Sequence, residues 1–309
     1  MNYVVTGGAG FVGSHLVNHL INEGHSVTIV DNLHSGKIKN LENVMSKIKF
    51  HKTDILDYQQ LKQIFEDSDG IFHQAALTVV QESFTMKDKY YDVNVNGTEN
   101  IFRLAKEFGL KVVYASSSSV YGNTEKVPIM EDAERKPINP YGETKLKDEF
   151  LVEKYAKLGV SIIGLRYFNI YGKGQSKSYA GVITKFMENL SNSKPPVIYG
   201  DGSQLRDFVY VGDVARANLM AMESSVKNGL INIGSGVAIS ISELARMMIE
   251  SSKLPIEPEY TKAVEGDIMK SQSNIELAKK LLNWEPKTKL KEWLDNILKN
   301  TTDLKEFGS

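Results

Sequence analysis

A glycine-rich turn near the start of the chain constrains its fold more than any other feature. The segment 6–13 reads TGGAGFVG; it follows a short apolar run and opens a run with a helical pattern. Gly7 permits a tight turn, Gly10 lets a bound group approach the backbone, and Gly13 lets the helix pack closely on the strand. The order of strand, glycine turn and helix is typical of a dinucleotide site, where the helix N-terminus faces the phosphates.

Asp31 ends the second apolar run, about 20 residues beyond the last glycine of the turn. A carboxylate at this point can accept hydrogen bonds from both hydroxyls of an adenosine ribose. The same carboxylate repels a 2′-phosphate, and the nearest cation is Lys37, at the end of the segment 32–37. The sequence therefore favours NAD as the cofactor, with NADP as the alternative.

Short β-rich runs alternate with helical patterns along the first half of the chain. The β-rich runs lie at 3–6, 26–30, 48–51, 71–73, 111–115 and 161–166. A long helix is expected at 140–158, with Asn139 as its N-cap and Pro140 in its first turn. Because strands separated by helices need crossover connections, the sheet should be parallel.

These patterns predict an α/β chain with a Rossmann-type, doubly wound parallel sheet and a smaller α/β C-terminal substrate lobe. The alternation becomes less regular after Gly172. We therefore expect an NAD-binding domain at 1–172, with parts of 205–235 returning to it, and a region at 173–309 that is mainly the substrate-binding lobe.

The composition excludes several classes of function. Lys and Arg total 37 against 38 for Asp and Glu, so the chain has no broad positive field for nucleic acid. It has no cysteine, which excludes disulfides and thiolate-bound metals and agrees with a reducing compartment. No room for a signal peptide precedes the first strand-like run, and no stretch of about 18 apolar residues occurs. We expect a cytoplasmic protein that has no nucleic-acid partner, membrane partner or metal site.

Tyr141 and Lys145 form a Tyr-x-x-x-Lys pattern at the start of the predicted long helix. Residues four apart lie on one face of a helix, about 5–6 Å apart at Cβ. A phenol is a poor base at neutral pH, but an adjacent ammonium and a positive nicotinamide ring both favour the phenolate. We predict that Tyr141 is the catalytic base and that Lys145 stabilises its charged form.

The chain resembles the extended short-chain dehydrogenase/reductase family over nearly its whole length. The resemblance rests on the Gly-x-x-Gly-x-x-Gly spacing and on segments at 54–55 (DI), 73–76 (HQAA), 94–98 (NVNGT), 115–122 (ASSSSVYG), 166–169 (RYFN) and 200–209 (GDGSQLRDFV). It implies an NAD-dependent enzyme that acts on a nucleotide-sugar, similar to the UDP-glucose 4-epimerase group.

The resemblance also implies the cofactor contacts. They are Gly7, Gly10, Phe11, Val12, Gly13, Asp31, Asn32, His34, Ser35, Gly36, Asp54, Ile55, Gln74, Ala75, Ala76, Thr78, Tyr141, Lys145, Tyr167 and Phe168. Asp54 is expected to contact the adenine, with a helix N-cap as the alternative. For Tyr167 and Phe168 the alternative is simple core packing.

The substrate contacts implied by the resemblance are Ser117, Ser118, Tyr141, Asn169, Val182, Tyr199, Arg206, Asp267 and Ser271. Ser117 falls on the family's catalytic Ser/Thr position, where its hydroxyl would bond the reacting sugar oxygen. The alternative for Ser116, Ser118 and Ser119 is a turn or a helix cap. Arg206 is expected to hold the diphosphate as a charge-assisted fork, with a surface salt bridge as the alternative.

The residues that follow Ser117 favour one reaction. A 4,6-dehydratase of this family has an Asp-Glu pair directly after its catalytic Thr, whereas this chain has Ser118 and Ser119. The resemblance therefore implies C4 epimerisation of a UDP-sugar through a transient 4-keto intermediate, with UDP-glucose and UDP-galactose as the default pair. The alternatives are a uronate 4-epimerase or decarboxylase, and a non-catalytic NAD-sensing binding protein.

Two positions leave the identity of the sugar open. Val264 stands where the family has an arginine for the diphosphate, and Lys262 is the cation available to replace it. Ser271, four residues past Asp267, is small, so N-acetylated UDP-hexosamines are expected to fit; the alternative is an exposed loop serine. The family's usual assembly implies a homodimer through two long helices, one of which carries Tyr141.

Overall fold

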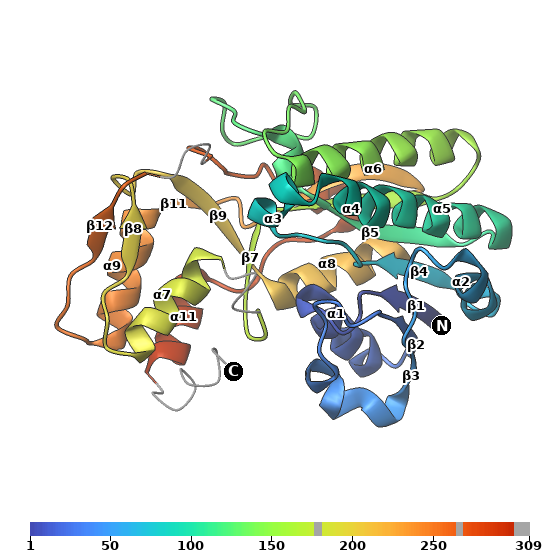
Figure 1. Ribbon diagram of the computed structural model, residues 1–309, viewed down its shortest axis with the longest axis horizontal. Helices are drawn as coiled ribbons and strands as arrows, with labels where there is room; N and C mark the ends of the chain where they lie inside the picture. Colours follow the sequence, from blue (N-terminus) through green and yellow to red (C-terminus); the bar gives the residue numbers. More distant parts are fainter. Residues whose placement is uncertain (176–180, 264–267, 300–309) are drawn as a thin grey trace.

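A seven-stranded parallel sheet forms the centre of the larger lobe. The computed structural model describes residues 1–175, 181–263 and 268–299 (Figure 1). The strand order is β10-β6-β5-β4-β1-β2-β3, and every neighbouring pair is parallel. These strands are β1 (Asn2–Thr6), β2 (Ser26–Val30), β3 (Ile48–His51), β4 (Gly70–His73), β5 (Lys111–Ser117), β6 (Ile162–Tyr167) and β10 (Asn228–Ile233). The order reverses at β1, so the predicted doubly wound, Rossmann-type fold is confirmed.

Helices cover both faces of this sheet (Figure 1). One face packs against α1 (Phe11–Asn22), the 3-10 helix η1 (Ile38–Lys47) and α8 (Val211–Glu223); the other packs against α2 (Tyr58–Phe65), α5 (Gly97–Phe108) and α6 (Pro140–Lys157). Along β1, Tyr3 and Val5 enter the first core and Val4 enters the second. Because successive side chains of a strand point to opposite faces, a short apolar run can serve both cores.

The helix that carries Tyr141 begins as predicted. Asn139 Oδ1 accepts a hydrogen bond from Gly142 N at 2.8 Å, and Pro140 occupies the first turn. Shorter elements lie between the strands and the longer helices: α3 (Val80–Thr85), α4 (Lys87–Tyr91), the π-helical turn η2 (Asp92–Asn96) and the 3-10 turn η3 (Ser118–Tyr121).

The smaller lobe, on the left of Figure 1, has its own core. A three-stranded sheet has the order β11-β9-β7, and β8 pairs with β12. Its elements are β7 (Asn169–Tyr171), α7 (Val182–Ser191), β8 (Val197–Tyr199), β9 (Leu205–Tyr210), β11 (Ala238–Ser240), α9 (Ile241–Ser252), β12 (Glu259–Thr261) and α11 (Leu290–Leu298). By contrast, α10 (Glu276–Leu282) and Trp284 pack into a core of the larger lobe.

The chain crosses between the lobes more than once. From the segment 205–235, α8 and β10 belong to the larger lobe, whereas β9 belongs to the smaller one. In the parts of the chain that the structure describes, none of the helices has the length and apolar character needed to cross a membrane.

Candidate active site

A cleft of about 1290 Å³ opens at the carboxyl ends of β1, β2 and β4. Its lining includes most of the predicted NAD contacts: Gly7, Gly10, Phe11, Val12, Gly13, Asp31, Asn32, His34, Ser35, Asp54, Ile55, Gln74, Ala75, Ala76 and Thr78. The predicted contacts outside this lining are Gly36, Tyr141, Lys145, Tyr167 and Phe168. In open α/β sheets, ligands bind at this end of the strands, where the strand order reverses.

The glycine turn is packed so closely that a side chain would not fit at Gly7 or Gly13. Gly7 has a positive φ of 69°, and a Cβ there would lie 2.7 Å from Ala75 N. A Cβ on Gly13 would lie 2.1 Å from Gly7 O, and one on Gly10 would lie 3.1 Å from the same oxygen. The residues that open α1 line the cleft, so the N-terminus of this helix lies beside it, an arrangement that fits a pyrophosphate.

Asp31 is held by backbone donors at the end of β2. Its Oδ2 accepts a hydrogen bond from Ala9 N at 2.9 Å, and its Oδ1 accepts one from Leu33 N at 2.8 Å. Burial raises the pKa of Asp31, and these two bonds oppose the rise. A Cβ on Gly36 would lie 2.9 Å from both carboxylate oxygens, so Gly36 lies against Asp31. Each oxygen keeps a lone pair, which fits the two hydroxyls of a ribose.

Asp54 lies in the cleft lining and does not cap a helix. The N-cap of α2 is Asp57, whose Oδ1 accepts a hydrogen bond from Gln60 N at 3.1 Å. Asp54 instead accepts hydrogen bonds from Leu56 N at 2.9 Å and from Asn32 Nδ2 at 2.8 Å. The N-cap alternative for Asp54 is therefore wrong.

The lining also contains residues that the sequence analysis missed. They include Ser14, His15, Asn18, Lys39, Asn40, Lys89, Lys173, Gly174 and Gln175. His15 Nε2, on α1, donates a hydrogen bond to Lys173 O at 2.8 Å, and burial lowers the pKa of this histidine. No local pattern could have indicated this contact, because it joins the first helix to the loop that follows β7.

Tyr141 and Lys145 lie on the first turns of α6. Tyr141 N donates a hydrogen bond to Ser83 Oγ at 3.2 Å, which ties the start of this helix to α3. Lys145 is only 3% exposed, and its Nζ donates a hydrogen bond to Asp148 Oδ2 at 3.3 Å. The ammonium is therefore held inside the protein, on the same helix as the phenol.

The serines at the end of β5 differ in what they contact. Ser116 is buried and donates a hydrogen bond to Glu149 Oε1 at 2.7 Å. Ser117 is half-buried; its Oγ accepts hydrogen bonds from Ser119 N at 3.2 Å and from Ser119 Oγ at 2.8 Å, and it caps η3. Ser116 thus lies within β5 and is neither in a turn nor a helix cap, whereas Ser118 and Ser119 lie in the 3-10 turn η3, which Ser117 caps.

A buried ion pair fixes α6 to the sheet beside these serines. Arg166 Nε and Nη2 donate hydrogen bonds to the two oxygens of Glu149, each at 2.8 Å. Arg135 Nη1 donates a further one to Glu149 Oε2 at 3.0 Å. A bidentate pair of this kind is geometrically specific, so it fixes the helix that carries Tyr141 relative to β6.

Comparison with known proteins identifies the family. The model of the NAD dependent epimerase/dehydratase family matches residues 3–234. The chain belongs to this family. The resemblance inferred from the motifs is confirmed, and NAD is the family's cofactor. The glycine turn and Asp31 fit that cofactor, as described above. Within the described residues, no cluster of three or more His, Asp or Glu side chains could hold a metal ion.

Relatives and solved structures of the family align with nearly the whole chain. A Methanocaldococcus jannaschii protein named "Putative UDP-glucose 4-epimerase" is 39% identical over 300 residues, 96% of each chain. A Thermotoga maritima UDP-glucose 4-epimerase with UDP-glucose is 36% identical, with a TM-score of 0.92 and coverage of 97% of this chain and 98% of that one. A UDP-N-acetylglucosamine 4-epimerase of Methanobrevibacter ruminantium is also 36% identical, with a TM-score of 0.92 and coverage of 96% and 97%. The chain is thus similar to family members that act on different UDP-sugars.

Two predicted cofactor contacts, Tyr167 and Phe168, are buried and lie outside the cleft lining. Tyr167 OH is hydrogen-bonded to Gln74 Oε1 at 3.2 Å and to Asn218 Oδ1 at 3.0 Å. Burial raises the pKa of this phenol well above its usual range. Phe168 is 4% exposed and packs in a small core with Tyr121. Tyr167 therefore orients Gln74, which itself lines the cleft.

Three predicted substrate contacts meet around β9. Asn169 lies opposite Phe208 in the β7–β9 pair, and its Nδ2 donates a hydrogen bond to Asp207 O at 3.2 Å. Arg206 Nη1 donates hydrogen bonds to the carbonyls of Leu205 and Ile268. Ser271 N donates one to Leu205 O at 3.1 Å. Ser271 is 7% exposed, so the alternative of an exposed loop serine is wrong.

The remaining predicted substrate contacts are spread more widely. Val182 begins α7 and Tyr199 ends β8, so both belong to the smaller lobe, and Tyr199 is 46% exposed. Ser118 begins η3 beside Ser117. Asp267 and Val264 lie outside the residues that the structure describes.

Proposed function

We propose that this enzyme catalyses the NAD-dependent C4 epimerisation of a UDP-sugar through a transient 4-keto intermediate, with UDP-glucose and UDP-galactose as the default pair. The observation that carries this proposal is the pair of residues after Ser117. A dehydratase of the family has Asp and Glu there, but this chain has Ser118 and Ser119. The Ser119 hydroxyl donates a hydrogen bond to the Ser117 hydroxyl. The site therefore lacks the second acid and base that water elimination needs.

The chain's own residues have distinct roles in this reaction. Tyr141 accepts the proton of the sugar 4-hydroxyl, and the Lys145 ammonium favours the resulting phenolate. Ser117 hydrogen-bonds the same sugar oxygen and keeps it in place as the carbon becomes planar. NAD bound in the cleft supplies the hydride acceptor and donor. Rotation of the ketone before hydride return inverts C4, and Tyr141 then returns its proton to the sugar oxygen.

The β9 region is the proposed diphosphate site. Arg206 and Asn169 come from paired strands and supply guanidinium and amide donors. A guanidinium matches the paired oxygens of a diphosphate better than an ammonium does, because its donors form a planar fork. Incubation with UDP-glucose, UDP-galactose and their N-acetyl counterparts, followed by chromatography, tests the reaction; no interconversion with or without added NAD would reject it.

Ser271 is proposed to leave room for an N-acetyl group. It is held close to β9 through Leu205, near Arg206. We expect the Ser271→Tyr variant to lose at least about tenfold in kcat/KM for UDP-N-acetylglucosamine while UDP-glucose is affected much less, since a steric clash at one group costs about 1–3 kcal/mol. Thermal unfolding shows whether the larger side chain is tolerated. An equal loss for both sugars would argue against this placement.

A related reaction remains the second candidate because two relatives favour it. A Bacillus cytotoxicus UDP-N-acetyl-alpha-D-glucosaminuronate decarboxylase is 34% identical, and a Thermodesulfobacterium geofontis UDP-glucuronate 4-epimerase is 35% identical. Turnover of UDP-glucuronate without turnover of UDP-galactose would favour this candidate. A non-catalytic NAD-sensing role is disfavoured because the chain keeps both Tyr141 and Lys145.

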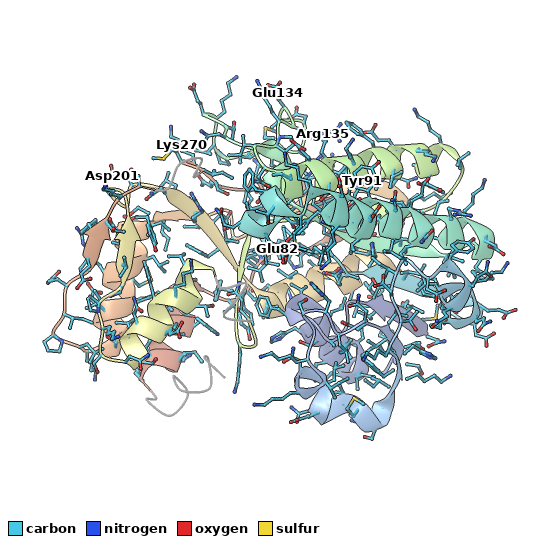
Figure 2. All side chains as sticks on the ribbon, viewed as in Figure 1. Glu82, Tyr91, Glu134, Arg135, Asp201 and Lys270 are labelled. Carbon is cyan, nitrogen blue, oxygen red and sulfur yellow. The ribbon has the colours of Figure 1, made fainter. Side chains whose placement is uncertain are left out.

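The functional unit is proposed to be a homodimer that buries an apolar surface on α3, α4 and α6. This surface exposes Phe84, Met86, Tyr91 and Phe150, and Figure 2 shows Tyr91 near α4 and α6. The Lys147 ammonium lies 5.6 Å from the Tyr91 ring, and Phe150 is one helical turn beyond Lys147. An exposed group of large apolar side chains is typical of an interface.

The Phe150→Glu variant is expected to dissociate this dimer, because it places a charge in the apolar surface. Light scattering should then report 34.5 kDa, the mass of one chain, where the wild type reports twice that mass. The control is Val237→Glu, which puts the same charge on an exposed apolar residue of the smaller lobe and should remain dimeric. A monomeric wild type would reject the dimer.

A further inference from the structure

Asp148 is a buried carboxylate next to the proposed catalytic pair. It lies on α6, three residues after Lys145, and its side chain is fully buried. Its Oδ2 accepts the hydrogen bond from Lys145 Nζ, but its Oδ1 has no hydrogen-bond partner within the described residues. A buried polar atom without a partner is rare in proteins and calls for an explanation.

The neighbouring carboxylate on α6 is fully paired. Glu149 accepts hydrogen bonds from Arg166 and Arg135 as well as from Ser116. Its negative charge is therefore compensated at contact distance by guanidinium groups. Asp148, by contrast, has the Lys145 ammonium as its ion-pair partner.

The groups that face this pair from the sheet carry no charge at neutral pH. On β4, His73 lies between two threonine hydroxyls, and burial together with the Lys145 charge lowers its pKa to about 3. On β5, burial holds the pKa of the Tyr114 phenol well above its usual range, and the nearby carboxylates add to this effect. Asp148 is therefore the group whose charge directly changes the field of Lys145.

We propose that Asp148 is a positioning residue that shares the Lys145 ammonium with Tyr141, so that its charge decides how strongly Lys145 favours the Tyr141 phenolate. The inference rests on the proposed roles of Tyr141 and Lys145. When Asp148 is ionised, the buried pair carries no net charge and the positive field at Tyr141 is weakened. When Asp148 is neutral, the full ammonium charge acts on the phenol.

The protonation of Asp148 changes in the range where such an enzyme works. Burial raises its pKa from 3.8 to about 7, against the opposing effect of Lys145. At lower pH the carboxyl is neutral and Lys145 acts fully on Tyr141. At higher pH the carboxylate competes for the ammonium, so the proton affinity of Tyr141 increases as the solution becomes more alkaline.

The test compares Asp148→Asn with Glu143→Gln, which removes the same charge from an exposed position on α6. Asp148→Asn should move the part of the acid limb of the kcat profile that lies above about pH 7 to lower pH by about one pH unit, since a charge at short range shifts a titration by 1–3 units. Below that pH the two profiles should coincide, because Asp148 is already neutral in the wild type. Glu143→Gln should leave the limb in place because solvent screens its charge. Asp148→Leu, which is similar in size and uncharged, should repeat the shift.

A readout independent of turnover separates this inference from the proposed reaction. The near-ultraviolet absorbance of tyrosinate is titrated with NAD bound, and the signal of the matching Tyr141→Phe protein is subtracted. If neither Asp148 variant shifts the Tyr141 titration while both fold and bind NAD, the inference is overturned. A shifted titration in a protein that converts none of the UDP-sugars would support the inference and reject the reaction.

Stability gives a second measure of the buried carboxyl. Because the folded protein holds this proton more tightly than the unfolded chain, ionisation favours unfolding between pH 3.8 and about 7. The unfolding free energy of the wild type should therefore fall relative to that of Asp148→Asn as the pH rises through this window, and the difference should level off above it. Parallel curves for the two proteins would contradict a buried ionisable group here and, with it, the inference.

Discussion

The Tyr141→Phe variant is expected to lose about 10³-fold in kcat, within the range that positioned acid–base groups contribute, while binding NAD as tightly as the wild type. The substitution removes the phenol oxygen, which is the proposed proton acceptor. The helix should stay in place because Tyr141 binds Ser83 through its backbone N–H, which phenylalanine keeps. NAD affinity should persist because the substitution leaves unchanged the glycine turn and Asp31, which are the proposed contacts of the pyrophosphate and the ribose.

The matched control is Tyr260→Phe. It removes the same oxygen from an exposed tyrosine of the smaller lobe, where the phenol is 3.5 Å from Ser242 Oγ. Its kcat should equal that of the wild type. Full activity in Tyr141→Phe would remove the assignment of the base, whereas equal losses in both variants would indicate a general effect on folding.

The Asp207→Asn variant is expected to lower the unfolding free energy by roughly 3–5 kcal/mol, because it disrupts a buried hydrogen-bond network. The Asp207 Oδ1 accepts hydrogen bonds from the N and Oγ of Ser235. Its Oδ2 accepts them from Gly236 N and from the N and Oγ of Ser273. Whichever way the amide of Asn is turned, its NH₂ group faces a backbone N–H that cannot rotate away.

Substrate affinity should fall together with stability in this variant. Asp207 lies between Arg206 and Phe208 on β9, and it holds the segment that follows Ser271. Denaturant unfolding and KM measure the two effects. Asp201→Asn is the control, because Asp201 is exposed at the edge of the smaller lobe (Figure 2) and, within the described residues, its carboxylate accepts hydrogen bonds from Ser203 only. Its loss of stability should be much smaller. Equal stability of the two variants would contradict the role given to Asp207.

Features that depend on residues close together in the sequence could be predicted from the sequence. The turn at 6–13 requires a backbone conformation and close contacts that only glycine tolerates, so the glycines in the sequence indicate the turn directly. The Tyr141/Lys145 spacing is a property of one helix, and the Asn139 cap marks where that helix begins. The parallel sheet followed from the alternation of strands and helices. Together these features indicated the strand ends at which the cleft lies.

Features that depend on distant pairings could not be predicted. The contact between His15 and Lys173 joins segments 158 residues apart, so no local pattern indicated that this loop lines the cleft. The contact between Tyr167 and Gln74 could not be predicted without knowing that β6 pairs with β5 and that β5 pairs with β4. The lack of a hydrogen-bond partner for Asp148 Oδ1 likewise depends on the segments that pack against α6. From the sequence, its position three residues after Lys145 indicates only an ordinary ion pair within one helix.

The hydrogen at C4 of the sugar provides the most direct test of the proposed reaction. UDP-galactose carrying deuterium at C4 is incubated with the enzyme in ordinary water, and the product is separated and analysed by mass spectrometry and NMR. Because the hydride leaves C4 and returns to it within one bound complex, we predict UDP-glucose that keeps its deuterium at C4. UDP-glucose with a C4 hydrogen taken from water, or no UDP-glucose even with added NAD, would contradict the proposed epimerisation.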